Sequence, residues 1–135
     1  MKATARRSNA FAHRIDIRQH QLVADEPPEK GGEDEGPSPQ ELLAASLASC
    51  TAITIEMYAK RKGWDVGQVE VQCEYAPAEP GGGTNFKLEL RFPSSLDPEQ
   101  VERLSVIAAK CPVHRTLDGE VTFEQQVELI EPAAS

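Results

Sequence analysis

Apolar and polar residues alternate over several stretches of the chain, the pattern of β-strands with one buried face. Residues 11–18 alternate in this way, and 21–24 follow after a short polar turn, so we expect the two to pair as a hairpin. The stretches 68–75 and 84–92 alternate as well and predict a second hairpin, joined by a loop rich in Pro and Gly. Residues 120–130 predict a last strand.

After residue 38 the apolar residues recur at spacings of three and four, which is the period of a helix and predicts a long one over 39–62. Ser38 suits the N-cap, Pro39 the first helical position, and Glu41 completes a capping box. Gly63, after a basic run, suits the position just past the helix end. Such a helix is about 36 Å long at 1.5 Å per residue, so we expect it to lie at the centre of a small domain.

One face of this helix is predicted to be buried, because apolar or small residues recur at spacings of three and four. Small side chains beside this stripe would let another helix approach closely. The predicted buried residues are Leu43, Leu47, Cys50, Ile53, Thr54 and Met57.

Two further helices are predicted in the second half of the chain. Asp97 and Pro98 repeat the cap-and-proline start of a helix that runs to about residue 110, and Cys111 and Pro112 start a shorter one. The resulting order β-β-α-β-β-α-α-β is that of an α+β domain, and 135 residues predict a single one. Its expected parts follow one another along the chain. They are N-terminal strands with an acidic Gly/Pro loop (1–37), a central helix (38–63), a hairpin (68–92), a second helix with a Cys-Pro turn (97–117) and a last strand (120–130).

The composition narrows the possible partners and locations. A formal net charge of −8 argues against nucleic-acid binding, which needs a basic face. The longest apolar run, 42–55, is shorter than the roughly 20 residues of a membrane span, and the N-terminus lacks the apolar segment of a secretion signal. We therefore expect a cytoplasmic protein without a membrane partner.

The three cysteines are widely spaced and odd in number, which does not suggest a disulfide framework. His13, His20 and His114 are scattered and no CxxC motif occurs, so we expect neither a metal site nor a cofactor. Cys73 shares its strand face with valines, which favours simple packing.

Cys50 and Cys111 each leave two interpretations open. Cys111 precedes a helix, where backbone N–H groups and the helix dipole lower a thiol pKa, but a buried turn cysteine fits equally well. Cys50 lies on the apolar stripe, where burial raises a thiol pKa and favours packing, unless the fold brings a cation close to it.

Two motifs resemble the OsmC/Ohr family, the osmotically induced and organic-hydroperoxide-resistance proteins. They are "GPSPQELLAASLASCTAITIEMYAKRKGW" over 36–64 and "AAKCPVHRTL" over 108–117, and they are more similar to the OsmC-like branch. The resemblance implies an intertwined homodimer with two long central helices, sheets wrapped outside, and sites built from both chains.

The resemblance also implies a chemistry and a set of site residues. Cys50 matches the family's peroxidatic thiol, which reduces an organic hydroperoxide and becomes a sulfenic acid. Cys111 matches the resolving thiol, which closes a disulfide that an external dithiol then reduces. In the family an arginine held by a glutamate activates the peroxidatic thiolate. The glutamate maps loosely onto Glu41, whose capping role also explains its presence, and the arginine onto Arg7. Three other arginines could take the place of Arg7: Arg6, Arg14 and Arg18.

Two other functions remain open from the sequence. The same dimer could hold an apolar or acyl ligand in its cleft, with the cysteines serving only as packing. Alternatively, the thiols could exchange disulfides with other proteins, which makes the chain a redox-regulatory partner rather than a peroxidase.

Overall fold

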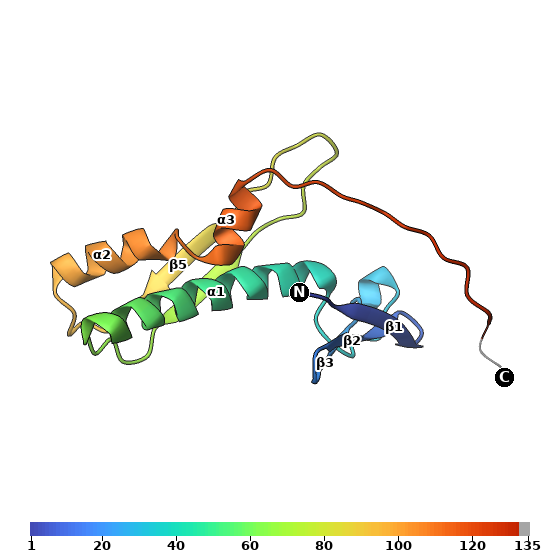
Figure 1. Ribbon diagram of the computed structural model, residues 1–135, viewed down its shortest axis with the longest axis horizontal. Helices are drawn as coiled ribbons and strands as arrows, with labels where there is room; N and C mark the ends of the chain where they lie inside the picture. Colours follow the sequence, from blue (N-terminus) through green and yellow to red (C-terminus); the bar gives the residue numbers. More distant parts are fainter. Residues whose placement is uncertain (133–135) are drawn as a thin grey trace.

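The computed structural model describes residues 1–132 of the chain and confirms the α+β class. Three helices lie together, a small sheet lies beyond the start of the longest helix, and a second sheet packs against that helix (Figure 1). The elements are β1 (Thr4–Asn9), β2 (Ala12–Ile17), β3 (His20–Ala24), η1 (Pro28–Lys30), α1 (Pro39–Lys62), β4 (Glu70–Glu74), β5 (Lys87–Arg91), α2 (Pro98–Ala108) and α3 (Pro112–Asp118).

The ends of α1 are those predicted from local chemistry. The Ser38 side chain accepts a hydrogen bond from the Glu41 backbone N–H at 3.2 Å, and the Glu41 carboxylate accepts the Ser38 N–H at 2.9 Å. Two N–H groups that no helical carbonyl can reach are thereby satisfied. At the other end Gly63 adopts φ 72°, a left-handed conformation that favours glycine and stops the helix.

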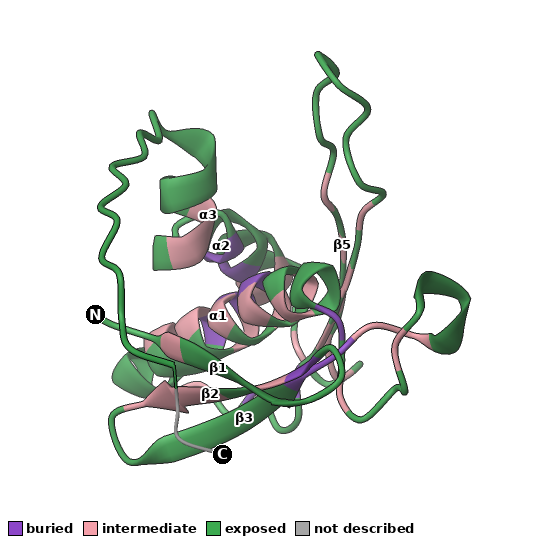
Figure 2. Cartoon of the chain, turned by 90° about the vertical axis from the view of Figure 1, so that its right-hand side faces the viewer, coloured by how far each residue is buried: buried purple, intermediate pink, exposed green. Residues whose placement is uncertain are grey.

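The core lies where α1, α2 and the β4–β5 hairpin meet. Ile55 and Leu104 are fully buried there, and Trp64 and Phe92 pack around them. Figure 2 shows the buried residues concentrated on the helices, whereas the N-terminal sheet is largely exposed. The helical half of the molecule is therefore stabilised by burial within one chain.

The N-terminal sheet has the strand order β1-β2-β3, with both pairs antiparallel. The predicted hairpin is confirmed as β2 and β3, in which Ile15 faces Leu22. The sequence analysis missed β1, because the segment TARRSN is mostly polar and lacks the alternation that marks a strand. The second predicted hairpin is confirmed as β4 and β5.

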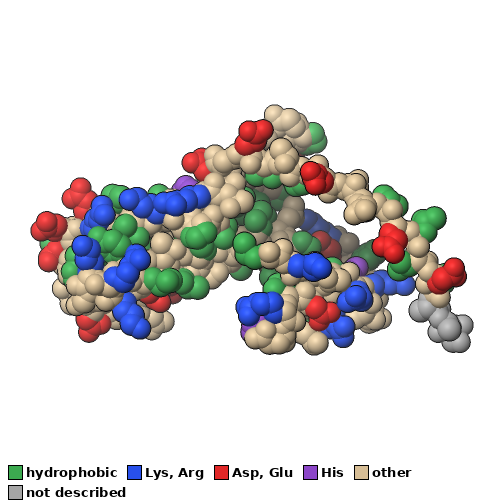
Figure 3. All heavy atoms as spheres, in the orientation of Figure 1, with side chains coloured by type: hydrophobic (Ala, Val, Ile, Leu, Met, Phe, Trp, Pro, Cys, Tyr) green, Lys and Arg blue, Asp and Glu red, His purple; other side chains and the backbone are tan. Residues whose placement is uncertain are grey.

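The prediction of a strand over 120–130 is wrong for the single chain. This segment, called here the C-terminal arm, leaves α3 as an extended chain without secondary structure, and its side chains are exposed. Figure 3 shows the arm extending away from the helices toward the right-hand side of the molecule, with hydrophobic side chains at its surface. A strand needs a neighbouring backbone to satisfy its N–H and C=O groups, and no strand within residues 1–132 pairs with the arm.

The predicted buried stripe of α1 is also largely wrong. The fully buried positions form one row at a spacing of four, whereas Ile53 and Met57 are more than half exposed and Leu43 and Cys50 are not fully buried. Apolar residues surround α1, so periodicity alone could not select the face that the rest of the chain covers. The buried row consists of Leu47, Thr51, Ile55 and Ala59.

Judged by length and composition alone, α1 is long and apolar enough to cross a membrane. The apolar run 42–55 was expected to be too short for this, so the two criteria disagree. Length and composition are weak evidence, because the central helix of a soluble domain meets the same criteria. In this fold α1 packs against α2, α3 and β4.

Candidate active site

The Cys111 sulfur is fixed at the start of α3. Its residue is the N-cap, and the sulfur accepts a hydrogen bond from the His114 backbone N–H at 3.2 Å. The Cys111 side chain is fully buried. The predicted Cys-Pro start of a short helix is thereby confirmed.

Cys50 reaches the same place from α1. The Cys111 side chain and the Val113 backbone are among the groups that shift the pKa of the Cys50 thiol, so both lie close to it. All three cysteines are free thiols. The fold therefore makes neighbours of two thiols that lie far apart in the sequence.

The surroundings of Cys50 disfavour its thiolate. Burial is the main cause that raises the pKa of the Cys50 thiol, and the hydrogen bond and charge of Cys111 raise it further. The Val113 backbone and the Thr54 hydroxyl lower it in part. None of these groups, which are the main influences on the pKa of Cys50, is a cation.

A mostly apolar cavity of about 550 Å³ lies near the start of α3, with His114 but neither cysteine in its lining. Two of its lining residues connect it to the cysteines. The His114 backbone N–H donates to the Cys111 sulfur, and the Leu47 carbonyl accepts the hydroxyl of Thr51, which lies beside Cys111. The cavity has space for a small organic molecule. Its lining residues are Leu43, Leu47, Tyr75, Thr84, Phe86, Leu88, His114, Leu117 and Asp118.

The structure leaves Glu41 apart from the cysteines. Glu41 precedes Cys50 by nine residues, on the order of 13 Å along a helix axis. Its carboxylate bonds the Ser38 backbone N–H, which lowers its pKa from the ordinary Glu value. Within one chain the capping role accounts for this residue.

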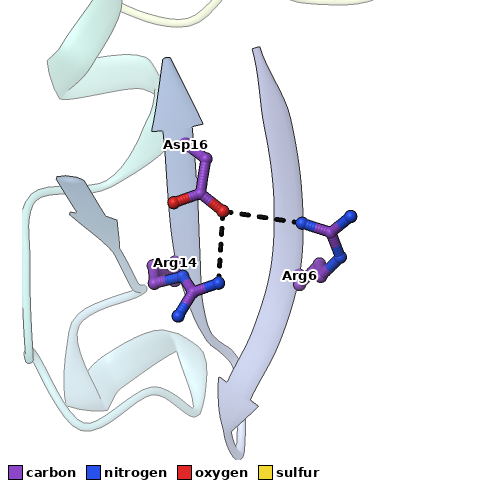
Figure 4. Close-up of polar contacts among 3 residues, drawn as sticks. All are labelled: Arg6, Arg14 and Asp16. Atoms are coloured by element: carbon purple, nitrogen blue, oxygen red, sulfur yellow. Dashed lines mark hydrogen bonds and ion pairs between the residues drawn. The ribbon is translucent and has the colours of Figure 1, made fainter. Parts of the chain in front are cut away.

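Arg7 is exposed on β1, and it is not among the groups that mainly shift the pKa of Cys50. Its neighbours are engaged elsewhere: Arg6 and Arg14 both bind the Asp16 carboxylate, at 3.5 and 3.3 Å (Figure 4). The single chain thus brings together the two cysteines and leaves the predicted activating pair outside the site.

The family model described as OsmC-like protein matches residues 32–126, more than half of the chain and a span that includes both cysteines. The chain belongs to the OsmC-like protein family. No curated protein matches it.

Solved structures of this family have the same fold. An osmotic stress induced and detoxification response protein from Psychrobacter arcticus 273-4 has a TM-score of 0.76 and 22% identity, covering 86% of this chain and 87% of that chain. The organic hydroperoxide resistance protein OsmC from Legionella pneumophila has a TM-score of 0.65 and 22% identity, covering 88% and 90%. The organic hydroperoxide resistance protein OhrB of Bacillus subtilis has a TM-score of 0.60 and 26% identity, covering 87% and 90%.

The sequence predicted no role at the thiols for Thr51 and Val113, and none for the Thr54 hydroxyl or the His114 backbone N–H. Thr51 and Thr54 bear hydroxyls that act on the two sulfurs, and His114 and Val113 contribute backbone groups. A threonine directly after a cysteine carries no distinct signal, and backbone donors have no sequence signature at all. Among the described residues, no group of three His, Cys, Asp or Glu side chains could hold a metal ion.

Proposed function

We propose that this OsmC-like protein is a cysteine-based thiol peroxidase that reduces organic hydroperoxides to alcohols. The Cys50 thiolate attacks one peroxide oxygen, the O–O bond breaks, and the alkoxide leaves as an alcohol after taking up a proton. Cys50 is then a sulfenic acid. Cys111 attacks the Cys50 sulfur, water leaves, and a disulfide forms, which an external dithiol reduces by two exchange steps.

The observation that carries this proposal is the contact between Cys50 and the fully buried Cys111. A resolving thiol must lie within bonding reach of the sulfenic acid, because disulfide geometry tolerates only short separations. The mostly apolar cavity near the start of α3 favours an organic peroxide over hydrogen peroxide, since it can bury an alkyl group. The names of the Legionella and Bacillus relatives point to the same substrate class.

A second copy of the chain completes the site in this proposal. The single chain exposes apolar side chains on α1 and along the C-terminal arm, which a partner subunit would cover by packing and by strand pairing. These side chains include Ile53, Met57, Phe123, Val127 and Leu129.

The partner subunit also supplies a positive charge beside Cys50. We assign this role to Arg7 of the partner subunit, held by Glu41, because Arg6 and Arg14 are already engaged by Asp16. A guanidinium beside the sulfur would stabilise the thiolate and lower its pKa. Arg7→Ala should therefore slow peroxide consumption at neutral pH and recover part of the rate at high pH, whereas Arg18→Ala should leave both unchanged.

A direct test mixes reduced protein with cumene hydroperoxide and follows the peroxide and the protein mass. The parent should consume about one equivalent of peroxide and lose two hydrogen atoms in mass. Cys50→Ser should consume none, Cys111→Ser should stop at the sulfenic acid, and Cys73→Ser should match the parent. Peroxide consumption by Cys50→Ser at the parental rate would refute the mechanism.

A second candidate function, binding of an apolar or acyl ligand, is favoured by the same cavity. A binder would be stabilised by a medium-chain fatty acid to the same extent with and without Cys50 and Cys111. A peroxidase with no binding role would show no such stabilisation, so a thermal shift measured on the parent and on the double serine variant separates the two functions.

The proposed chemistry requires a reducing compartment, because the cycle starts from free thiols and ends by dithiol reduction. We therefore place the protein in the cytoplasm as part of the proposal. Fractionation followed by thiol labelling would test this: protein recovered with its cysteines already paired would contradict it.

A further inference from the structure

Thr51 directly follows Cys50 on α1, yet its hydroxyl serves the other cysteine. The Thr51 side chain is fully buried, and its oxygen lies 3.7 Å from the Cys111 sulfur. The same hydroxyl donates to the Leu47 carbonyl at 2.8 Å. A fully buried hydroxyl that reaches both a helix carbonyl and a thiol is more than a packing group.

The hydroxyl can stabilise both protonation states of Cys111, because it carries one hydrogen and two lone pairs. While Cys111 is a thiol, Thr51 donates to Leu47 and its oxygen can accept the S–H. Once Cys111 loses its proton, the hydroxyl can rotate and donate to the thiolate. Leu47 still receives the Thr51 backbone N–H within the helix, so the rotation leaves no carbonyl without a partner.

Protein groups must do this work, because Cys111 is excluded from water. A buried negative charge without donors is strongly disfavoured. Besides the Cys50 thiol, the Cys111 sulfur has two donors beside it, the His114 backbone N–H at 3.2 Å and the Thr51 hydroxyl at 3.7 Å. Cys50 has its own hydroxyl neighbour, Thr54. Each thiol therefore has its own threonine hydroxyl: Thr51 for Cys111 and Thr54 for Cys50.

We propose that Thr51 is a positioning residue for the resolving step, in which its hydroxyl holds the Cys111 sulfur against Cys50 and stabilises it as a thiolate. The inference rests on the proposed peroxidase function. In this step the Cys111 thiolate attacks the sulfur of the Cys50 sulfenic acid, the S–S bond forms and the S–O bond breaks. The oxygen leaves as hydroxide and becomes water on protonation, so Cys111 is oxidised and the sulfenic sulfur reduced.

The first experiment measures sulfenic acid and disulfide separately in a single turnover with limiting cumene hydroperoxide. Thr51→Val keeps the side-chain shape and removes the hydroxyl, and we expect disulfide closure to slow roughly tenfold or more. Formation of the sulfenic acid should stay within about twofold of the parent, because the Thr51 hydroxyl bonds Leu47 and Cys111, and the hydroxyl that acts on the attacking thiol is that of Thr54. Dimedone trapped at Cys50 should increase accordingly.

Three variants control for a structural effect. Thr51→Ser retains a hydroxyl and should recover most of the closure rate, and Thr54→Val should change sulfenic acid formation and not closure. Thr51→Ala replaces Thr51→Val if the latter does not fold. Closure at the parental rate in Thr51→Val, equal slowing in Thr51→Val and Thr51→Ser, or equal slowing in Thr54→Val would each overturn the inference.

The pH profile of closure gives a readout that packing alone would not move. The rate should rise with pH as Cys111 ionises, and in Thr51→Val this rise should shift to higher pH. The other titratable groups of this region, Cys50 on α1 and Lys110, His114 and Arg115 around Cys111, are the same in parent and variant. An unshifted profile would overturn the inference.

A second experiment needs no peroxide and separates the inference from the peroxidase proposal. In a Cys73→Ser background, dithiobis-nitrobenzoate forms a mixed disulfide at Cys50, and attack by Cys111 then releases a second coloured thiolate. Thr51→Val should slow only this second release. If the parent shows the second release but consumes no peroxide, the proposed function fails while the role of Thr51 is still measured. If Thr51→Val releases it as fast as the parent, the inference fails by itself.

Discussion

The two halves of the molecule bury their apolar side chains to very different extents. The helical half, built from α1, α2 and the β4–β5 hairpin, contains the fully buried Ile55 and Leu104. In the N-terminal sheet only two alanines are buried, and in the C-terminal arm Phe123 and Leu129 are more than 90% exposed. One half is therefore stable within a single chain, whereas the other has apolar surface that a second copy is proposed to cover.

The largest effect on stability is expected in the helical half. Leu104→Ala should destabilise the chain by about 2 to 5 kcal/mol, because it removes a fully buried side chain and leaves a cavity. Leu129→Ala, measured on the separated chain, should change stability by less than about 0.5 kcal/mol, since that side chain contacts solvent. Urea unfolding of both variants provides the measurement. Equal losses would remove the distinction between the halves.

The next effect tests the exposed half. Phe123→Asp with Leu129→Asp should separate the proposed dimer, because each buried apolar side chain contributes about 1.5 to 3 kcal/mol. Helix content should persist, since the arm lies outside the core of the single chain. Sedimentation and circular dichroism measure the two outcomes. Gln126→Asp adds a charge at an alternate position of the same arm and should leave the dimer intact. A parent protein that sediments as a single chain would contradict the dimer.

A smaller effect is expected at the boundary between the halves, where α1 begins. Ser38→Ala removes one side of the capping box and should cost about 1 kcal/mol. Ser49→Ala removes a hydroxyl from the middle of the same helix, where it bonds the Ala45 and Ser46 carbonyls of that helix, and should change stability by less than about 0.5 kcal/mol. Thermal unfolding compares the pair, and a larger loss in Ser49→Ala would argue against the cap.

The smallest effect is a pH dependence in the loop that joins the N-terminal sheet to α1. Asp25 accepts backbone N–H groups from Glu26, Glu33 and Glu35, and the bond from Glu35 is the main cause that lowers its pKa. A lowered pKa gives stability that is complete above the ordinary Asp value near 4 and is lost as pH falls through the lower folded value. The melting temperature of the parent should therefore exceed that of Asp25→Asn at pH 7, and the difference should shrink below pH 4. A constant difference would disprove the linkage.

Local chemistry made much of the helical half predictable. Ser38, Pro39, Glu41 and Gly63 set both ends of α1, since capping needs only groups within one helical turn. The Cys-Pro start of α3 follows for the same reason. By contrast, the polar strand β1 gave no periodic signal, and the arm alternates like a strand yet pairs with no strand in the part of the chain that the structure describes.

The candidate site was predictable only in part. The family resemblance singled out Cys50 and Cys111, and the fold makes them neighbours. The threonine hydroxyls and backbone N–H groups that surround the sulfurs have no sequence signature, because they depend on how α3 docks against α1. The roles of Glu41 and Arg7 stay predictions, since the single chain holds both apart from the sulfurs.

By itself, the sequence of this OsmC-like protein determined where its helices begin and end, because those limits depend on hydrogen bonds between residues a few positions apart. Only the tertiary structure decided which face of α1 is buried and that Thr51 turns its hydroxyl to Cys111. Apolar residues surround α1, so its buried side is fixed by what packs against it, and such long-range packing leaves no local trace in the chain.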